Sequence, residues 1–255
     1  MMQNQVALVT GAGHGLGQAI ALALAEVGCR VFGGDLSWDE LQSTKDLVER
    51  RKGFFQPAVF DVCDAQAWNQ WIETIKSRES RLEILVNNAG GVAGQTHQDV
   101  EFVDDRLWDK VIKINLYGAF YGIRAVAPLM KTQHYGRIIN ISSGAGRSHS
   151  LTGIQAYTSA KAGQIGLTRQ MAAELGPFGI TVNNVAPGFV RSNPATEKQW
   201  EAMGEEGQRK LVESIPVRRL GTPMDIAHMV RFLASPETGY VTGQVISVDG
   251  GHSMF

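Results

Sequence analysis

The chain has 255 residues, of which 44% are hydrophobic and 8% aromatic, and its 24 basic and 25 acidic residues leave a net charge of −1. This length suits one α/β unit with a sizeable core, so we expect a single domain over residues 1–255. The balanced charge without a basic stripe argues against a nucleic-acid partner, and the longest apolar stretch, Ala19–Ala25, is far short of the ~20 residues of a membrane-spanning helix.

The first predicted unit is a strand, a glycine-rich turn and a helix. Gln5–Thr10 is a short Val-rich apolar run typical of a buried strand, and Gln18–Val27 is rich in helix formers. The turn between them places Gly11, Gly15 and Gly17 in the spacing G-x-x-x-G-x-G rather than G-x-G-x-x-G. Such a turn lets the backbone approach a pyrophosphate at a helix N-terminus, so we predict nucleotide binding. A turn that only packs a helix on a strand is the structural alternative.

The second predicted strand, Cys29–Asp35, ends in an acid 18 residues after Gly17. A carboxylate there accepts hydrogen bonds from the ribose 2′- and 3′-hydroxyls and repels a 2′-phosphate, which carries about −1.5 to −2 charges. The nearby residues His14 and Leu36 do not supply the Arg or Lys that usually binds the 2′-phosphate of NADP. We therefore predict NAD rather than NADP. Asp35 could also cap a helix that begins at Trp38.

A tyrosine and a lysine share one face of a later helix, which we expect to continue to about Leu175. Tyr157 and Lys161 are four residues apart, a spacing that brings the phenol and the ammonium within reach of each other. A phenol ionises near pH ~10, and a nearby positive charge is expected to lower its pKa. The pair could then take a proton from an alcohol. A surface pair without chemistry has the same spacing.

Taken together, five motifs make nearly the whole chain similar to the short-chain dehydrogenase/reductase family. They stand in the family's order and near its spacing: Thr10–Gly17, Asn87–Gly90, Ile141–Ser143, Tyr157–Lys161 and Pro187–Gly188. Strand-like runs also alternate with helical patterns from Val6 to Val248, which indicates a parallel sheet. The resemblance implies a doubly wound, Rossmann-like α/β fold with seven strands in the order 3-2-1-4-5-6-7 and helices on both faces.

The resemblance implies four catalytic residues. Tyr157 would be the acid/base, Lys161 would lower its pKa and hold the nicotinamide ribose, and Ser143 would bind the substrate oxygen. Asn115 would bend its helix and hold a water that connects Lys161 to solvent. Other hydroxyls stand close to Ser143 in the sequence: Ser142, Ser148 and Ser150.

The resemblance also implies a set of cofactor contacts. Asp61 and Val62 would contact the adenine, Asn88 to Gly90 would lie under the cofactor, and Val190 with Ser192 would bind the carboxamide. The full set is Gly11, His14, Gly15, Leu16, Gly17, Asp35, Leu36, Asp61, Val62, Asn88, Ala89, Gly90, Tyr157, Lys161, Pro187, Gly188, Val190 and Ser192.

A substrate lid is expected over about residues 190–213, a segment rich in polar residues. Six residues are candidates for substrate contact: Ser143, Arg147, His149, Gln155, Arg191 and Trp200. Either arginine could pair with a substrate carboxylate or phosphate, or be an exposed loop residue. Because the lid is not notably apolar, we favour a small polar substrate such as a sugar, polyol or hydroxy acid.

The expected activity is NAD-dependent interconversion of a secondary alcohol and a ketone by hydride transfer, with Tyr157 as acid/base. The alternative enzyme is an NADPH-dependent reductase of 3-oxoacyl thioesters or other carbonyl compounds. A more remote alternative is a binding protein that senses NAD without chemistry, although all four implied catalytic side chains are present.

Assembly and location are the last expectations. Small residues on the Tyr157 helix, and the tendency of the family to pair through it, favour a homo-oligomer, with a tetramer expected before a dimer. The segment Val248–Phe255 could form a second contact. The histidines and the two cysteines show no ligand spacing, so no metal is expected and Cys29 and Cys63 are predicted to be apolar fillers. No secretion leader is visible, which predicts a cytoplasmic protein.

Overall fold

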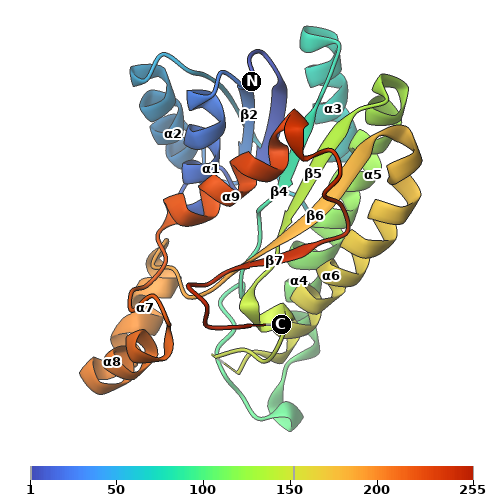
Figure 1. Ribbon diagram of the computed structural model, residues 1–255. Coiled ribbons are helices and arrows are strands. Elements are labelled where there is room, and N and C mark those ends of the chain that lie inside the picture. Colours follow the sequence, from blue (N-terminus) through green and yellow to red (C-terminus); the bar gives the residue numbers. More distant parts are fainter. Residues whose placement is uncertain (1, 152, 255) are drawn as a thin grey trace.

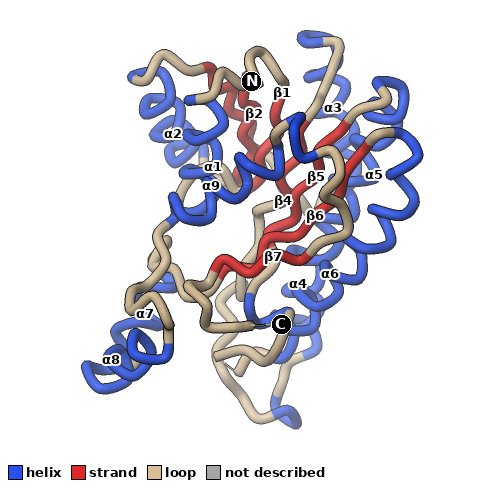
Figure 2. The backbone as a smooth tube through the Cα atoms, viewed as in Figure 1, coloured by secondary structure: helices blue, strands red, loops and turns tan. Residues whose placement is uncertain are grey.

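Seven parallel strands form the centre of the protein in a computed structural model that describes residues 2–151 and 153–254. The strand order is β3-β2-β1-β4-β5-β6-β7, which confirms the order expected from the sequence (Figures 1 and 2). The strands are β1 (Val6–Thr10), β2 (Arg30–Asp35), β3 (Phe54–Val59), β4 (Ile84–Asn87), β5 (Gly136–Ile141), β6 (Ile180–Pro187) and β7 (Val245–Val248). The order reverses between β1 and β4, so a crevice is expected where their carboxyl ends diverge.

Helices cover both faces of this sheet. Helices α1, α2 and α9 lie on one face, and α3, α5 and α6 lie on the other (Figure 1). The α-helices are α1 (Gly15–Glu26), α2 (Trp38–Arg50), α3 (Ala65–Glu79), α4 (Asp105–Ile112), α5 (Gly118–Gln133), α6 (Gln155–Leu175), α7 (Pro194–Ala202), α8 (Gly204–Ser214) and α9 (Pro223–Ala234). The short helices are η1 (Val100–Phe102), η3 (Gly144–Gly146), η4 (Gly176–Phe178) and η5 (Pro236–Thr238), and η2 (Lys113–Tyr117) is a π-helical turn between α4 and α5.

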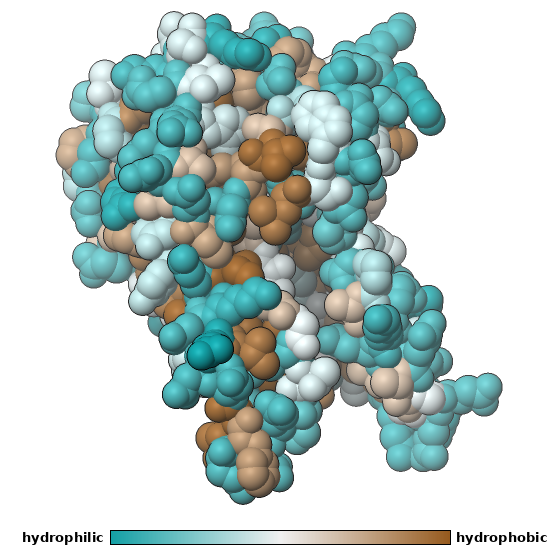
Figure 3. All heavy atoms as spheres, turned by 180° about the vertical axis from the view of Figure 1, so that it is seen from behind, coloured by the Kyte–Doolittle hydropathy of each residue, from teal (hydrophilic) through white to brown (hydrophobic). Residues whose placement is uncertain are grey.

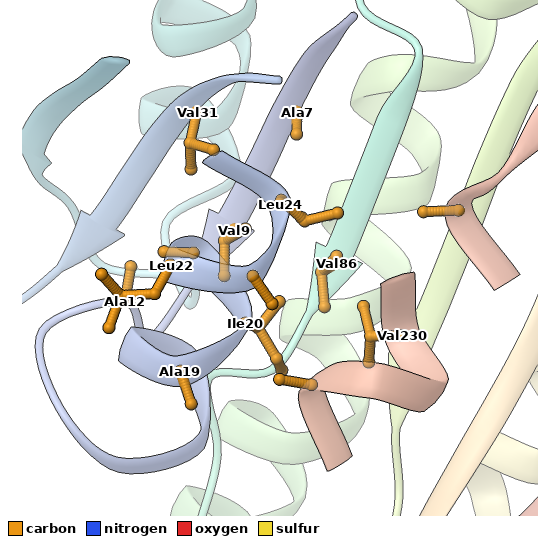
Figure 4. Close-up of a cluster of buried hydrophobic side chains, with 14 of the residues drawn as sticks. Ala7, Val9, Ala12, Ala19, Ile20, Leu22, Leu24, Val31, Val86 and Val230 are labelled. Carbon is orange, nitrogen blue, oxygen red and sulfur yellow. The ribbon is translucent and has the colours of Figure 1, made fainter. Parts of the chain in front are cut away.

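Helix α1 is held between the sheet and α9. Its residues Ile20 and Leu24 are fully buried, and Figure 4 shows them among side chains of the strands and Val230 of α9. Full burial of such a side chain stabilises the fold by roughly 1.5–3 kcal/mol. This packing explains why eight of the twelve residues of α1 are buried, and it fixes the position of the N-terminus of the helix.

On the other face, an aromatic cluster supports the end of β3. The Phe60 ring lies 4.7 Å from Trp68 and 4.8 Å from Trp71, both on α3, as centroid separations. The Trp68 indole donates a hydrogen bond to the carbonyl of Val62 at 3.1 Å. These two tryptophans therefore have a structural role, and they support the turn that carries Asp61 and Val62.

Among the described residues, five of the nine α-helices begin with a side-chain cap, and α1 is one of the four that do not. Ser37 caps α2, Asp64 caps α3, and Asn193 with Thr196 forms a capping box at α7. In α1 the N-cap residue His14 makes no side-chain cap bond, and the first turn contains no acidic residue. The amide groups at this helix end are thus available to an external acceptor.

Two further features concern cysteines and membranes. Cys29 and Cys63 are both free thiols, as predicted. In the part of the chain that the structure describes, no helix combines the length and apolarity that crossing a bilayer requires.

Candidate active site

The turn between β1 and α1 needs its glycines. Gly11 and Gly15 have φ angles of 65° and 57°, in the left-handed region that favours glycine. A Cβ on Gly17 would lie 1.8 Å from the carbonyl oxygen of Gly11, so a side chain there would force the helix away from the turn. The Asn88 amide donates to the carbonyls of Thr10 and Gly11 at 3.0 and 3.1 Å. The end of β4 thus holds the turn in place.

A carboxylate occupies the end of β2, where we expect the adenosine ribose. Asp35 accepts hydrogen bonds from the backbone N–H groups of Gly13 at 2.9 Å and Leu36 at 2.7 Å. Because Ser37 is the N-cap of α2, the alternative in which Asp35 caps that helix is wrong. The carboxylate instead braces the glycine turn.

Two further charged or ionisable groups lie beside Asp35. The imidazole of His14 lies 3.0 Å from the carboxylate of Glu40, as Nδ1 to Oε2. One imidazole nitrogen of His14 and one carboxylate oxygen from each of Asp35 and Glu40 all lie within 4.8 Å of one another. Sequence reasoning did not find Glu40, because it lies 26 residues after His14 and only the packing of α2 against the turn brings them together.

A cavity of about 600 Å³ opens beside the glycine turn and the ends of β4, β5 and β6. Most of the predicted site residues line it: Gly11, His14, Gly15, Leu16, Asn88, Ala89, Gly90, Ser143, His149, Tyr157, Lys161, Pro187, Gly188, Val190 and Ser192. The predicted cofactor residues outside the lining lie at the start of α1 and after β2 and β3: Gly17, Asp35, Leu36, Asp61 and Val62. From behind, the surface is hollowed beside the projecting α7–α8 pair (Figure 3).

Ser143 and Tyr157 meet at the wall of this cavity. Their side chains share a hydrogen bond, and Ser143 Oγ also accepts one from the Ala145 N–H at 3.1 Å. The neighbouring Ser142 is buried and its hydroxyl donates to the Lys161 carbonyl at 3.0 Å. The structure therefore brings Ser143, and not Ser142, to the tyrosine, and Ser148 and Ser150 also line the cavity.

Lys161 is buried one helical turn after Tyr157. Its ammonium donates to the carbonyl of Ile141 at 2.8 Å and lies 5.6 Å from the centroid of the Tyr157 ring. A Cβ on Gly90 would fall 3.3 Å from Lys161 Nζ and 2.5 Å from Asn115 Oδ1. Both polar atoms therefore flank the same glycine, and only glycine leaves room for them.

The pKa shifts of the pair differ from the expectation drawn from the sequence. Burial raises the pKa of Tyr157 above its ordinary value, and the hydrogen bond with Ser143 opposes that shift. Burial also lowers the pKa of Lys161 to about 7. The expected lowering of the tyrosine pKa by the lysine is therefore not what the structure shows, because burial disfavours the charged form of both groups.

Asn115 stands in the π-helical turn between α4 and α5. Its side-chain amide donates to the carbonyls of Gly91 and Val111, both at 2.8 Å, and accepts a hydrogen bond from the Gly91 N–H at 3.0 Å. Its main-chain carbonyl accepts a bond from the side chain of Gln164 at 2.6 Å. Gln164 was not found from the sequence, where it stands in an ordinary helical pattern.

Four of the six substrate candidates lie outside the cavity lining. The Arg147 guanidinium donates to the Val245 carbonyl at 3.0 Å and to Ser247 Oγ at 2.9 Å, which holds it on β7. Arg191 pairs with Glu197 at 2.7 Å, with its guanidinium 5.5 Å from the Trp200 ring.

Gln155 donates to the Gln98 carbonyl at 2.8 Å. Arg147, Gln155, Arg191 and Trp200 are thus absent from the described lining in this arrangement, and their contact with the substrate stays a prediction. Ser143 and His149 do line the cavity. Sequence reasoning missed other lining residues from the loop after β6, from the end of α8 and from the C-terminal segment: Phe189, Leu211, Ile215, His252 and Met254.

These residues fit a dinucleotide. The uncapped N-terminus of α1 offers amide donors for a pyrophosphate, and the glycine turn allows close approach. Asp35 offers carboxylate oxygens for ribose hydroxyls, and the cavity continues from the turn to Ser143, Tyr157 and Lys161. A dinucleotide that followed this cavity would reach the tyrosine–lysine pair.

Known proteins share this arrangement over nearly the full chain. The family description that matches residues 11–253 is enoyl-(acyl carrier protein) reductase. A 3-oxoacyl-[acyl-carrier-protein] reductase FabG from Thermotoga maritima is 38% identical over 250 residues, which cover 98% of this chain and 98% of the relative. A cyclohexanol dehydrogenase from Rhodococcus sp. is 36% identical over 271 residues, covering 98% and 96%. The crystal structure of an actinorhodin polyketide ketoreductase with NADPH is 30% identical, with a TM-score of 0.91 and coverage of 99% and 98%.

The sheet order, the glycine turn and the full-length similarity lead to one assignment. The chain belongs to the short-chain dehydrogenase/reductase family and is an NAD(P)-dependent oxidoreductase that acts on CH–OH groups.

Proposed function

We propose that this protein is an NAD-dependent dehydrogenase of a small, neutral, polar secondary alcohol. The observation that carries the proposal is the hydrogen-bonded pair Ser143–Tyr157 at the cavity wall, with Lys161 buried one turn away. A panel of secondary alcohols, screened for NADH formation, tests it directly. An enzyme that oxidises none of them at any pH between about 7 and 10 is not the dehydrogenase proposed here.

The chain's own residues supply the proton chemistry. When bound, the nicotinamide accepts a hydride from the carbinol carbon or returns one to the carbonyl carbon. Tyr157 removes the hydroxyl proton during oxidation and returns it during reduction. Ser143 Oγ donates a hydrogen bond to the substrate oxygen and orients it toward the tyrosine. Lys161, held by the Ile141 carbonyl, stabilises the phenolate as it forms.

The carboxylates of Asp35 and Glu40 support a preference for NAD. Both lie at the ribose corner, and both repel the additional charges of a 2′-phosphate. The neighbouring His14 already has a partner in Glu40, so a phosphate would compete with that carboxylate.

Replacing Asp35 by alanine should weaken this preference. We expect kcat/KM with NAD to fall by roughly 10- to 100-fold, because hydrogen bonds to a charged group contribute about 1.5–3 kcal/mol, while kcat/KM with NADP rises. Steady-state kinetics with both cofactors measures the ratio. Asp39→Ala removes an exposed acid from the first turn of α2 and serves as the control. An unchanged ratio in Asp35→Ala would contradict the role given to this carboxylate.

The similarity to FabG and to a ketoreductase with NADPH favours a second candidate, an NADPH-dependent reductase of 3-oxoacyl thioesters. The same residues would serve it, since Tyr157 then donates a proton to the carbonyl oxygen. The two candidates separate in one comparison: turnover of a 3-oxoacyl thioester with NADPH against turnover of a cyclic alcohol with NAD.

The cavity also supports a neutral substrate. Among the described residues that line it, Lys161 is the only lysine or arginine, and three histidines, His14, His149 and His252, complete the basic groups. Arg147 and Arg191 are engaged elsewhere. A substrate carboxylate would therefore enter without an arginine partner, which does not favour the hydroxy acids included in the sequence-based expectation.

A matched pair of substrates tests this inference. We expect a cyclic diol to be oxidised with a kcat/KM at least roughly 100-fold above that of the ring carrying a carboxylate in place of one hydroxyl, because burial of an unpaired carboxylate costs several kcal/mol. The neutral carboxamide of the same ring is the control for size. Equal rates for the carboxylate and the carboxamide would show that charge is not selected against.

Three expectations from the sequence stay predictions. We propose that α7 and α8 act as the lid, since Leu211 and Ile215 reach the cavity from the end of this segment. On α6, Ala162 and Gly166 are exposed and available to a partner, whereas Ala160 is buried within the chain. These exposed small residues support a homo-oligomer but do not distinguish a tetramer from a dimer, and a cytoplasmic location is likewise a prediction.

A further inference from the structure

Gln164 is a buried polar residue close to the catalytic lysine. It stands three positions after Lys161 on α6, so the two side chains lie on neighbouring positions of one helix face. Gln164 is 1% exposed, and its amide nitrogen donates to the Asn115 carbonyl at 2.6 Å. Its amide oxygen has no hydrogen-bond partner among the described residues. A buried amide oxygen normally has a partner in the protein or in an ordered water.

The groups around Gln164 are suited to hold a water molecule. The Asn115 side-chain amide gives both of its N–H donors to the carbonyls of Gly91 and Val111, and its main-chain carbonyl is an acceptor on the Gln164 side. A carbonyl has two lone pairs, and Gln164 occupies one of them. Lys161 carries three ammonium donors, of which one goes to the Ile141 carbonyl. Gln164 and Asn115 thus supply two acceptors and Lys161 supplies donors, all from α6 and the π-helical turn that it contacts, and a buried water needs two to four such partners.

We propose that Gln164 is a positioning residue for the proton path beyond Lys161. Its amide nitrogen fixes the Asn115 carbonyl, and its amide oxygen accepts a hydrogen bond from a buried water that Lys161 contacts. The proton that Tyr157 removes from the alcohol passes to Lys161, Lys161 releases one proton to this water, and the water releases one to bulk solvent, so the lysine and the water are both restored in each cycle. This inference rests on the proposed dehydrogenase function for its kinetic test, but not for its structural one.

Thr168, the next buried polar residue on this face of α6, belongs to a separate hydrogen bond in the core. Thr168, one turn after Gln164, accepts a hydrogen bond from the Asn140 amide at 2.9 Å and is fully buried. Thr168 makes no bond to Asn115 or Lys161 in the described hydrogen-bond network. Thr168→Val therefore removes a buried hydrogen bond of α6 without touching the proposed path, and it is the matched control.

Gln164→Met, which keeps the side-chain volume and removes both polar atoms, is the principal variant. We expect kcat for alcohol oxidation to fall by roughly 10- to 100-fold, a part of the ~10²–10⁴-fold that a positioned acid/base contributes, with KM for NAD within a few-fold. Proton release should then limit turnover. The D₂O effect on kcat should increase, and the effect of deuterium at the carbinol carbon should decrease. Thr168→Val should leave both isotope effects unchanged.

Gln164→Glu separates the two halves of the proposal, because it keeps an acceptor and loses the donor to Asn115. We expect it to recover part of the kcat lost in Gln164→Met. A Gln164→Met enzyme with unchanged kcat and unchanged isotope effects would overturn the proposal, as would a glutamate variant no better than methionine.

The structural test does not depend on activity or on the folding of a variant. A high-resolution crystal structure of the unaltered protein should show an ordered water within hydrogen-bond distance of both Gln164 Oε1 and the Asn115 carbonyl. Clear density for both side chains with no water between them would overturn the proposal. A water at this position in a protein without dehydrogenase activity would instead count against the proposed function alone.

Discussion

Replacing Tyr157 by phenylalanine should reduce kcat by at least roughly 10²- to 10⁴-fold, the contribution of a positioned acid/base. The ring keeps its place on α6, but the hydroxyl that meets Ser143 at the cavity wall is lost. Because phenylalanine changes neither the glycine turn nor Asp35, the dissociation constant for NAD should stay within a few-fold. Stopped-flow measurement of NADH formation and a fluorescence titration with NAD provide the two values.

Tyr121→Phe is the matched control for this experiment. Tyr121 lies on α5 beside Phe120 and Arg124, away from the cavity lining, so its substitution should leave kcat nearly unchanged. A Tyr157→Phe enzyme that retained most of its turnover would show that another group acts as the base. The hydroxyls of Ser148 and Ser150 would then have to be reconsidered, since both line the cavity.

The second large effect concerns stability and its pH dependence. Burial lowers the pKa of Lys161 to about 7, whereas a lysine in the unfolded chain titrates near pH ~10.4. Below about pH 7 both states bind the proton, and the folded state carries the full cost of a buried ammonium. Between about pH 7 and pH 10 the unfolded chain binds more protons at Lys161 than the folded protein does. The free energy of unfolding therefore rises with pH in this range.

Lys161→Met should therefore stabilise the protein most at low pH. We expect the gain in free energy of unfolding over the unaltered protein to be about 2–3 kcal/mol larger at about pH 6.5 than at about pH 9, since each pKa unit corresponds to about 1.4 kcal/mol. Urea denaturation at the two pH values measures this difference. Burial raises the pKa of Cys29 to about 12 and of Cys63 to about 11, but both residues are in both proteins, and their contributions cancel in the comparison.

Lys110→Met provides the control, because Lys110 is an exposed residue in the last turn of α4 and has no comparable burial cost. Its gain should be the same at both pH values. If the gain from Lys161→Met were also independent of pH, Lys161 would be protonated in the folded protein throughout this range. The interpretation of its buried surroundings would then be wrong.

Taken from the residues alone, the sequence determined the elements of the fold and much of the site. Gly11, Gly15 and Gly17 indicated a turn that must approach a phosphate, and the structure shows the left-handed angles and the close contact that exclude other residues. The motifs also placed Ser143, Tyr157 and Lys161 together correctly. Local spacing was sufficient in these cases because each motif lies at a strand end or on one helix face.

The tertiary structure decided what depends on contacts between distant segments. Glu40 reaches His14 only because α2 packs beside the glycine turn, and Arg147 leaves the cavity because β7 offers it two acceptors. The direction of the Tyr157 pKa shift also required the fold. Residue spacing reports the distance to a charge, but the removal of water, which disfavours both charged forms, is a property of the packed protein.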